Sequence, residues 1–284
     1  MNKNVTMTFR DRELCFDTPK VMGILNVTPD SFSDGGQFST FDKAIQQAEN
    51  MVNAGAVFID VGGESTRPGA EPVSLQEELD RVIPIIEKIS KNLDVIVSVD
   101  TSKADVMTQA VQHGAGLIND VRALRADGAL NAAIQAALNF KVPSCLMHMQ
   151  GAPKTMQKQA SYQNVVEDVL AFFKQRLFDC AQAGLSTEQI LIDPGFGFGK
   201  TLDHNYQLLK HLHAFEQLGV PILVGMSRKS MIGNLLDRDV NQRLAGNIAT
   251  ATIAALAGVA IIRVHDVEET MDAVKIANKL QSVE

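Results

Sequence analysis

Residues 190–200 read ILIDPGFGFGK, so a short apolar run ends at Asp193 and passes directly into a polar, glycine-rich turn. The same unit recurs along the chain, with an amphipathic stretch and a glycine before each new apolar run. Apolar residues are continuous within each run, which is typical of parallel strands covered on both faces. The eight apolar runs are residues 21–25, 57–61, 95–99, 117–118, 145–147, 190–192, 222–224 and 261–264.

These eight strand–helix units follow one another without a linker or a low-complexity segment. The repetition predicts an α/β fold, a (β/α)8 TIM barrel, with residues 1–284 as a single domain. An open, doubly wound sheet is the alternative, because a strand count does not show that the sheet closes. Residues 1–17 differ from the repeat, and within them residues 5–17 predict two short strands that form an N-terminal β-hairpin.

The composition is that of an ordinary globular protein, with 45% hydrophobic and 21% charged residues. The formal net charge is 26 − 33 = −7, which argues against nucleic acid or an anionic membrane as a partner. Cys15, Cys145 and Cys180 lie far apart and lack metal-ligand spacing, which favours a reducing compartment. The first 14 residues are polar, and the most apolar stretch, residues 253–262, is shorter than the roughly 20 residues that span a bilayer. We therefore expect a cytoplasmic protein.

Polar side chains gather where the predicted strands end. In a barrel, these ends and the loops after them share one rim, where active sites are built. A single polar residue at such a place is typically a helix cap, and that interpretation is preferred for Thr101, Asp120 and Asp266. Seven polar residues of different types stand at these strand ends, and helix capping alone would not require such varied side chains. We therefore expect a binding site at this rim. The set comprises Asn26, Asp100, Asn119, Asp193, Lys229, Arg263 and His265.

The cationic members of this set indicate an anionic ligand. Lys229, Arg263 and His265 belong to the seventh and eighth units, where barrels frequently bind phosphate. Arg67, in the loop after the second run, is expected to close over the same anion. An arginine binds phosphate oxygens through a bidentate fork of charge-assisted hydrogen bonds.

The carboxylates indicate a different part of the ligand. Asp100 and Asp193 end apolar strands, so we expect them to be partly buried, where a carboxylate requires donors or positive charge. A flat heterocycle with an amino-amidine edge offers two parallel N–H donors to one carboxylate. Asn119 suits a mixed edge, because an amide both donates and accepts. The alternative for either aspartate is a structural ion pair with Lys229 or Arg263.

The longer motifs at these strand ends are NVTPDSFSDGG (26–36), GGESTRPG (62–69), DPGFGFGK (193–200), GMSRKS (225–230) and RVHD (263–266). Together they resemble the signatures of the dihydropteroate synthases, in their monofunctional bacterial form. The resemblance covers nearly the whole chain, and several ordered motifs of this length are far more specific than one short pattern. It implies a TIM barrel, a homodimer and Mg²⁺ as a cofactor.

The family joins 6-hydroxymethyl-7,8-dihydropterin diphosphate to 4-aminobenzoate and releases diphosphate and 7,8-dihydropteroate. Position by position, the resemblance implies three groups of contacts. The pterin would be held by Asp100, Asn119, Asp193 and Lys229. The diphosphate would be surrounded by Thr66, Arg67, Arg263, His265 and Asn26, with Asn26 also contacting Mg²⁺. The aminobenzoate pocket would be shaped by Phe32, Pro68, Phe198 and Ser230.

The implied mechanism is a dissociative substitution. Diphosphate departs first, and Mg²⁺, Arg263 and His265 meet its growing charge. Asp34 and Asp100 would then stabilise the pterin-methyl cation until the amine of 4-aminobenzoate attacks, so no strong general base is required. Sulfonamides are expected to compete with 4-aminobenzoate. The alternatives are a pterin-binding methyltransferase and a catalytically silent pterin-binding homologue, and the intact loop motifs disfavour both.

Overall fold

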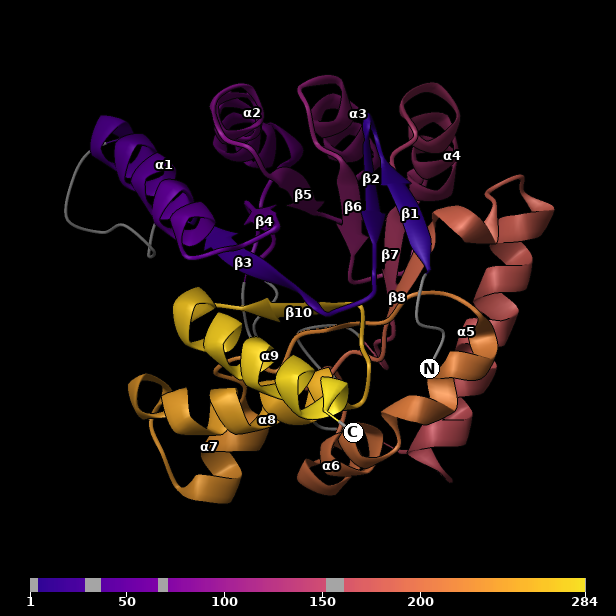
Figure 1. Cartoon of the computed structure of the whole chain (residues 1–284). Helices are drawn as coiled ribbons and strands as arrows, with labels where there is room; N and C mark the ends of the chain where they lie inside the picture. Colours follow the sequence, from indigo (N-terminus) through magenta and orange to yellow (C-terminus); the bar gives the residue numbers. More distant parts are fainter. Residues whose placement is uncertain (1–4, 29–36, 66–70, 152–160, 284) are drawn as a thin grey trace.

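The computed structural model describes residues 5–28, 37–65, 71–151 and 161–283, whose arrangement is shown in Figure 1. The strands are β1 (Thr6–Phe9), β2 (Arg12–Cys15), β3 (Lys20–Asn26), β4 (Phe58–Gly62), β5 (Ile96–Asp100), β6 (Leu117–Asp120), β7 (Ser144–Met147), β8 (Ile190–Asp193), β9 (Leu223–Val224) and β10 (Ile261–Val264). The α-helices are α1 (Gln37–Asn53), α2 (Leu75–Asn92), α3 (Ala104–Gln112), α4 (Ala129–Phe140), α5 (Val165–Gln182), α6 (Leu202–Lys210), α7 (Ser230–Leu236), α8 (Leu244–Leu256) and α9 (Val267–Ser282). The 3-10 helices are η2 (Thr187–Gln189), η3 (Leu212–Leu218) and η4 (Val240–Gln242).

Within the described residues, eight strands form one parallel sheet in the order β8-β7-β6-β5-β4-β3-β10-β9. The two outer strands also meet, because Ile222, directly before β9, forms a parallel bridge with Ile192 of β8. The N–H of Ile192 donates to the carbonyl of Pro221 at 3.0 Å. The sheet is therefore rolled into a barrel with helices around it (Figure 1). The predicted TIM barrel is confirmed, and the open sheet is excluded.

Successive side chains of each strand point alternately into the barrel and towards the helices. In β4, Phe58 packs in the barrel interior, whereas Ile59 and Val61 join the larger core beneath the helices. By the same alternation, Asp60 points into the barrel, and it is fully buried. The interior of this barrel therefore contains a charge among apolar layers.

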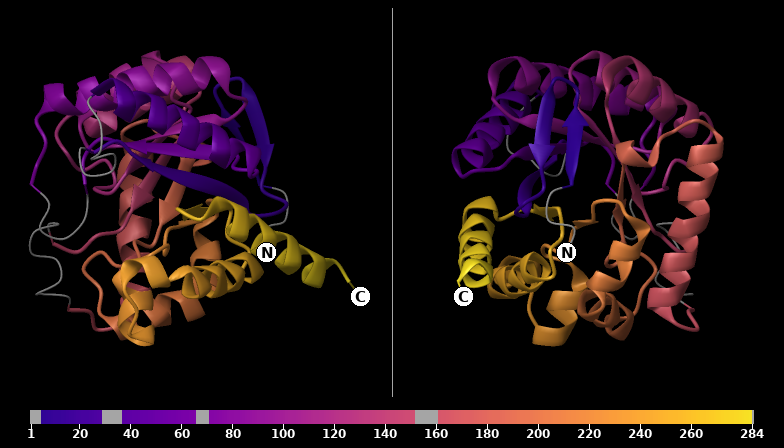
Figure 2. Two further views of the ribbon diagram at one scale, coloured as in Figure 1. Left: turned by 90° about the vertical axis from the view of Figure 1, so that its left-hand side faces the viewer. Right: turned by 45° about the vertical axis from the view of Figure 1, so that its right-hand side comes forward.

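The predicted N-terminal hairpin is also confirmed, with β1 and β2 paired antiparallel. Met7 and Phe9 are buried with the interior strand residues at the amino ends of the strands. The Phe9 ring meets the Phe58 ring edge-on, with 5.2 Å between the centroids. Figure 2 shows the hairpin across one end of the barrel. Because the hairpin covers the amino ends of the strands, we expect a ligand site at the opposite end of the barrel, at the carboxyl ends of the strands.

The cysteines in the described part of the chain are free thiols. Cys145 and Cys180 are buried free thiols, and Cys15 is a partly exposed one. None of the helices in the described part of the chain is both long and apolar enough to cross a membrane.

Candidate active site

The predicted site residues that the structure describes lie at the carboxyl ends of the strands. Asn26, Asp100 and Asp193 are the last residues of β3, β5 and β8, and Asn119 is the last but one of β6. Arg263 lies within β10, His265 directly follows it, and Lys229 and Ser230 stand at the start of α7 after β9. Because the ends of parallel strands share one rim, closure of the barrel brings these side chains together.

Arg263 is at the centre of this group. Its Nε donates to Asp60 Oδ2 at 2.5 Å, and its Nη2 donates to Asp100 Oδ2 at 2.8 Å. Burial by itself would lower the pKa of Arg263, but the charges of Asp60 and Asp100 outweigh it and raise that pKa. The structural ion pair considered as the alternative for Asp100 is therefore present, and it involves Arg263.

Asp100 remains an unusual carboxyl group despite this partner. Burial raises its pKa to about 7, and the charge of Asp60 adds to the increase, while Arg263 opposes it. One guanidinium thus neutralises two buried carboxyl groups only in part.

Asp60 is a site residue that the sequence analysis missed. Its Oδ2 also accepts a hydrogen bond from Asn119 Nδ2 at 3.1 Å. The available signal was a charged residue inside the apolar run FIDVG (58–62), because a buried charge requires a partner. The sequence FIDVG does not, however, predict which residue pairs with Asp60.

Asp193 and Lys229 form the second charged group. Asp193 Oδ1 accepts from the backbone N–H of Gly195 at 2.8 Å, and burial raises the pKa of this carboxyl while Lys229 opposes the shift. Lys229 Nζ donates to the carbonyl of Phe196 at 2.6 Å and lies 4.6 Å from the centre of the Phe198 ring. Burial lowers the pKa of Lys229 to about 8, with Asp193 acting in the opposite direction.

Lys200, at the end of the glycine-rich turn, is buried beneath this group. Its Nζ donates to the carbonyls of Gly195 at 2.8 Å and Phe198 at 3.1 Å, and it lies 3.0 Å from His148 Nδ1. Burial lowers the pKa of Lys200 to about 7, and burial together with the Lys200 charge lowers that of His148 to about 2. Lys200 therefore joins the end of β7 to the turn after β8. Lys200 ends the motif DPGFGFGK, but the motif by itself predicts no role for it.

His265 is held by Ser227. The Ser227 Oγ accepts from the His265 backbone N–H at 3.2 Å and lies 3.0 Å from the ring Nδ1. Ser230 is exposed, and Phe198 is buried with Met147 and Met149.

The helix-cap predictions are wrong. Asp120 closes a turn instead, since its carboxylate accepts from the backbone N–H groups of Arg122 and Leu124, whereas the next helix, α4, has Gly128 at its N-cap. The expected capping by Asp266 is wrong: its carboxylate makes no cap hydrogen bond and instead accepts from the side chains of Arg228 and Asn247. These two partners lie on neighbouring elements that sequence spacing does not reveal.

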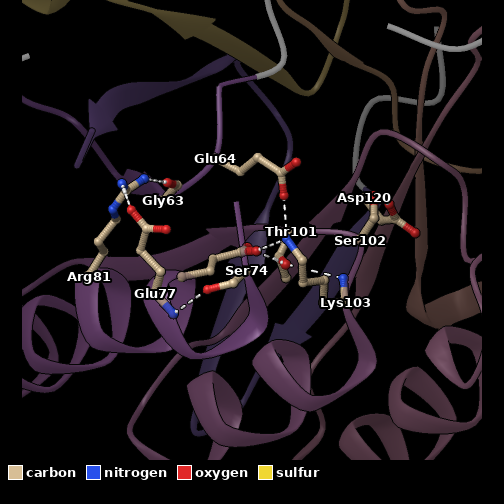
Figure 3. A network of polar contacts seen from close by, with 10 residues as sticks. Gly63, Glu64, Ser74, Glu77, Arg81, Thr101, Ser102, Lys103 and Asp120 are labelled. Carbon is tan, nitrogen blue, oxygen red and sulfur yellow. Dashed lines mark hydrogen bonds and ion pairs between the residues drawn. The ribbon is translucent and has the colours of Figure 1, made fainter. Parts of the chain in front are cut away.

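Thr101 does not cap a helix either, because the N-cap of α3 is Lys103. It belongs to a polar network beside β4 and β5, shown in Figure 3. Its hydroxyl donates to the buried Glu78 at 2.6 Å and accepts from the Lys103 N–H at 3.2 Å. The Lys103 ammonium binds both Glu78 and Glu64, and Arg81 donates to the carbonyl of Gly63 at 2.7 Å. The network fixes the chain where it leaves β4. Five predicted site residues lie outside the described residues: Phe32, Asp34, Thr66, Arg67 and Pro68.

Comparison with known sequences identifies the family. The family model described as pterin binding enzyme matches residues 22–265. The dihydropteroate synthase of Haemophilus influenzae is 53% identical over 264 residues, which cover 92% of this chain and 94% of that protein. The dihydropteroate synthase of Escherichia coli K12 is 54% identical over 258 residues, which cover 91% of this chain and 90% of that protein.

Solved structures agree with this match. Yersinia pestis dihydropteroate synthase with a sulfonamide drug is 52% identical, with a TM-score of 0.93 over 98% of this chain and 100% of that chain. Xanthomonas albilineans dihydropteroate synthase with 4-aminobenzoic acid is 46% identical, with a TM-score of 0.92 over 99% of this chain and 100% of that chain. The chain therefore belongs to the pterin-binding enzyme family, as one of its dihydropteroate synthases.

Proposed function

We propose that this chain condenses 6-hydroxymethyl-7,8-dihydropterin diphosphate with 4-aminobenzoate, giving 7,8-dihydropteroate and diphosphate. The observation that carries the proposal is a group of hydrogen-bond acceptors at the strand ends, next to the cationic side chains of Arg263 and Lys229. Asp100 Oδ1, Asn119 Oδ1 and Asp193 Oδ2 make no hydrogen bond to described residues, yet they are not among the buried oxygens that lack a partner. These three oxygens are therefore accessible, and they belong to residues at the carboxyl ends of β5, β6 and β8, where they match the N–H donors of a pterin ring.

The cations suit the other end of this substrate. Arg263 uses Nε and Nη2 on carboxylates, which leaves Nη1 for an anion. Lys229 and His265 lie on the same side of the rim, after β9 and β10. In the reaction, the bond between the pterin methylene carbon and the diphosphate oxygen breaks, and a bond from that carbon to the amine nitrogen of 4-aminobenzoate forms. The departing oxygen keeps the electron pair, and Arg263, Lys229 and the His265 ring stabilise the resulting charge on the diphosphate, while the amine loses its proton to water.

Asn26 fits the role of a magnesium ligand. Its amide oxygen and Asp100 flank Gly62, since a Cβ at position 62 would lie 3.8 Å from Asn26 Oδ1 and 3.5 Å from Asp100 Cβ. Among the described residues, no cluster of three or more His, Cys, Asp or Glu side chains forms a metal site. Mg²⁺ commonly takes one or two protein oxygens and completes its shell with water and substrate phosphate. We infer that Asn26 supplies such an oxygen, and that bound Mg²⁺ neutralises charge on the diphosphate.

A homodimer and a cytoplasmic location complete the proposal. Large apolar side chains are exposed on α7, α8 and α9, which pack side by side in Figure 1. The free thiols are consistent with a reducing compartment. The exposed apolar residues of these helices include Leu235, Leu236, Ile253, Ile276 and Leu280.

Release of diphosphate tests the proposed reaction. With Mg²⁺ and the pterin diphosphate, release is expected to be rapid only when 4-aminobenzoate is also present, and dihydropteroate should appear in equal amount. Sulfamethoxazole should raise the apparent KM for 4-aminobenzoate without changing kcat. Binding of the pterin without turnover would instead indicate a silent pterin-binding protein.

The catalytic efficiency is expected to fall as the pH rises above about 8. Because the pKa of Lys229 is lowered to about 8, its ammonium loses its proton in this range and no longer attracts the anionic substrate. The measurement is kcat/KM for the pterin diphosphate between about pH 6 and about pH 10. Lys229→Gln should have a lower kcat/KM at neutral pH and no such decline, and an unchanged decline in this variant would contradict the assignment.

A further inference from the structure

Asp60 lies beneath the site, and nothing in the proposed reaction gives it contact with a substrate. It is fully buried in β4, and one oxygen, Oδ2, accepts from both Arg263 Nε at 2.5 Å and Asn119 Nδ2 at 3.1 Å. The other oxygen, Oδ1, is buried and has no hydrogen-bond partner in the described part of the chain. The two partners come from β6 and β10, so Asp60 joins both sides of the site.

The chemistry of this contact determines how the Asn119 amide is turned. An amide side chain has a donating nitrogen on one arm and an accepting oxygen on the other. The Asp60 Oδ2 that it meets is already an acceptor for Arg263, so it attracts the nitrogen of Asn119 and repels the oxygen. The assignment of the two amide atoms therefore follows from Asp60 itself. Asn119 Oδ1 remains on the opposite arm, and it is accessible near the carboxyl end of β6, as are the free oxygens of Asp100 and Asp193 at the ends of their strands.

We propose that Asp60 is a positioning residue that sets the hydrogen-bond polarity of the site, by obliging Asn119 to present its oxygen to an N–H donor of the pterin ring. The proposal deepens the proposed function and rests on it. It also refines the expectation that Asn119 serves a mixed edge, because one of the two N–H groups of its amide is used by Asp60.

An exchange of the two residues tests this role. In Asp60→Asn, either arm of the new amide can face Asn119, so Asn119 is free to turn, and binding of 6-hydroxymethylpterin is expected to weaken about tenfold or more. Asn119→Asp places two carboxyl groups against each other and should weaken binding at least as much. The double variant Asp60→Asn/Asn119→Asp restores one donor facing one carboxylate, with a free oxygen towards the pterin, but its new amide nitrogen also lies against the Arg263 Nε–H, because one Asp60 oxygen accepts from both partners in the wild type. It should therefore recover part of the lost affinity and bind more tightly than either single variant.

Ser98 provides the matched control. It is the register partner of Asp60 on β5, it is fully buried, and its hydroxyl has no hydrogen-bond partner among the described residues. Ser98→Ala therefore changes a buried polar side chain at the same level of the barrel without touching Asn119 or Arg263. Its affinity for 6-hydroxymethylpterin, measured by titration calorimetry, should equal that of the wild type.

The outcomes separate the possibilities. A role in packing alone would leave the double variant no better than the weaker single variant, and that result, or wild-type binding by Asp60→Asn, would overturn the proposal. A wild type that releases diphosphate while the exchange fails to restore binding would overturn this proposal but leave the proposed function intact. A wild type that binds no pterin would overturn both.

A second measurement does not depend on whether the variants fold. In a crystal structure of the wild type with 6-hydroxymethylpterin, a ring or amino N–H is expected within hydrogen-bond distance of Asn119 Oδ1. A ring carbonyl or an unprotonated ring nitrogen at that position would overturn the proposal.

Discussion

Replacing Arg263 with methionine is expected to lower kcat/KM by about 10²- to 10³-fold and to destabilise the fold by about 3–5 kcal/mol. The substitution keeps much of the side-chain volume but leaves Asp60 and Asp100 as neighbouring buried carboxyl groups without a cation. It also removes the N–H groups that we assign to the diphosphate. Steady-state kinetics and urea unfolding measure the two effects separately.

The pH dependence of stability gives a sharper form of this prediction. The pKa of Asp100 is about 7 in the folded protein against 3.8 as its ordinary value, so the folded state binds more protons between these values. Stability from this group is therefore fully present below about pH 4 and is lost as the pH rises through about 7. Because Arg263 opposes the shift, Arg263→Met should raise the pKa of Asp100 further and lose more stability over this range.

Arg228→Met is the matched control for Arg263→Met. Arg228 also pairs with an aspartate, Asp266, but its side chain is 38% exposed whereas that of Arg263 is 17% exposed. Arg228→Met should lower the free energy of unfolding by about 1 kcal/mol or less, since solvent screens the ion pair of Arg228 with Asp266. Equal unfolding free energies for the two variants at neutral pH would contradict the account of a buried charged centre.

Replacing Lys200 with methionine is expected to destabilise the protein by about 3–5 kcal/mol, although Lys200 touches no substrate in the proposed reaction. The change leaves the carbonyls of Gly195 and Phe198 and the Nδ1 of His148 without their shared donor in a buried place. The turn after β8 should become more mobile. The carbonyl of Phe196 and the ring of Phe198, which contact the Lys229 ammonium, would then position Lys229 less precisely. We therefore expect a higher KM for 4-aminobenzoate in addition to the lower stability.

Lys210→Met distinguishes this effect from the general loss of a lysine. Lys210 is exposed in the last turn of α6, so its replacement should change the free energy of unfolding by no more than about 0.5 kcal/mol. Thermal and urea unfolding of both variants, with KM for each substrate, provide the comparison. A Lys200→Met protein as stable as Lys210→Met would show that the buried ammonium does not hold the turn.

The strands, the hairpin and the rim were predictable because each depends on short-range pattern. Continuous apolar runs specify strands buried on both faces, and the residue after each run lies at the carboxyl end whatever the rest of the chain does. The pattern therefore suffices to assign one set of residues to a common rim: Asn26, Asp100, Asn119, Asp193, Lys229, Arg263 and His265.

The partners of these residues were decided only by the tertiary structure. Arg263 meets Asp60 across 203 positions of sequence and Asp100 across 163. Whether Asp100 is ion-paired, where Asp266 directs its carboxylate and which arm of Asn119 is free all depend on such contacts. Periodicity describes what one segment buries, whereas a hydrogen-bond partner depends on the register and closure of strands far apart in the chain. The bridge between Ile192 and Ile222 closes the barrel, and the pairing of β3 with both β10 and β4 places Arg263 and Asp60 on neighbouring sides of one interior.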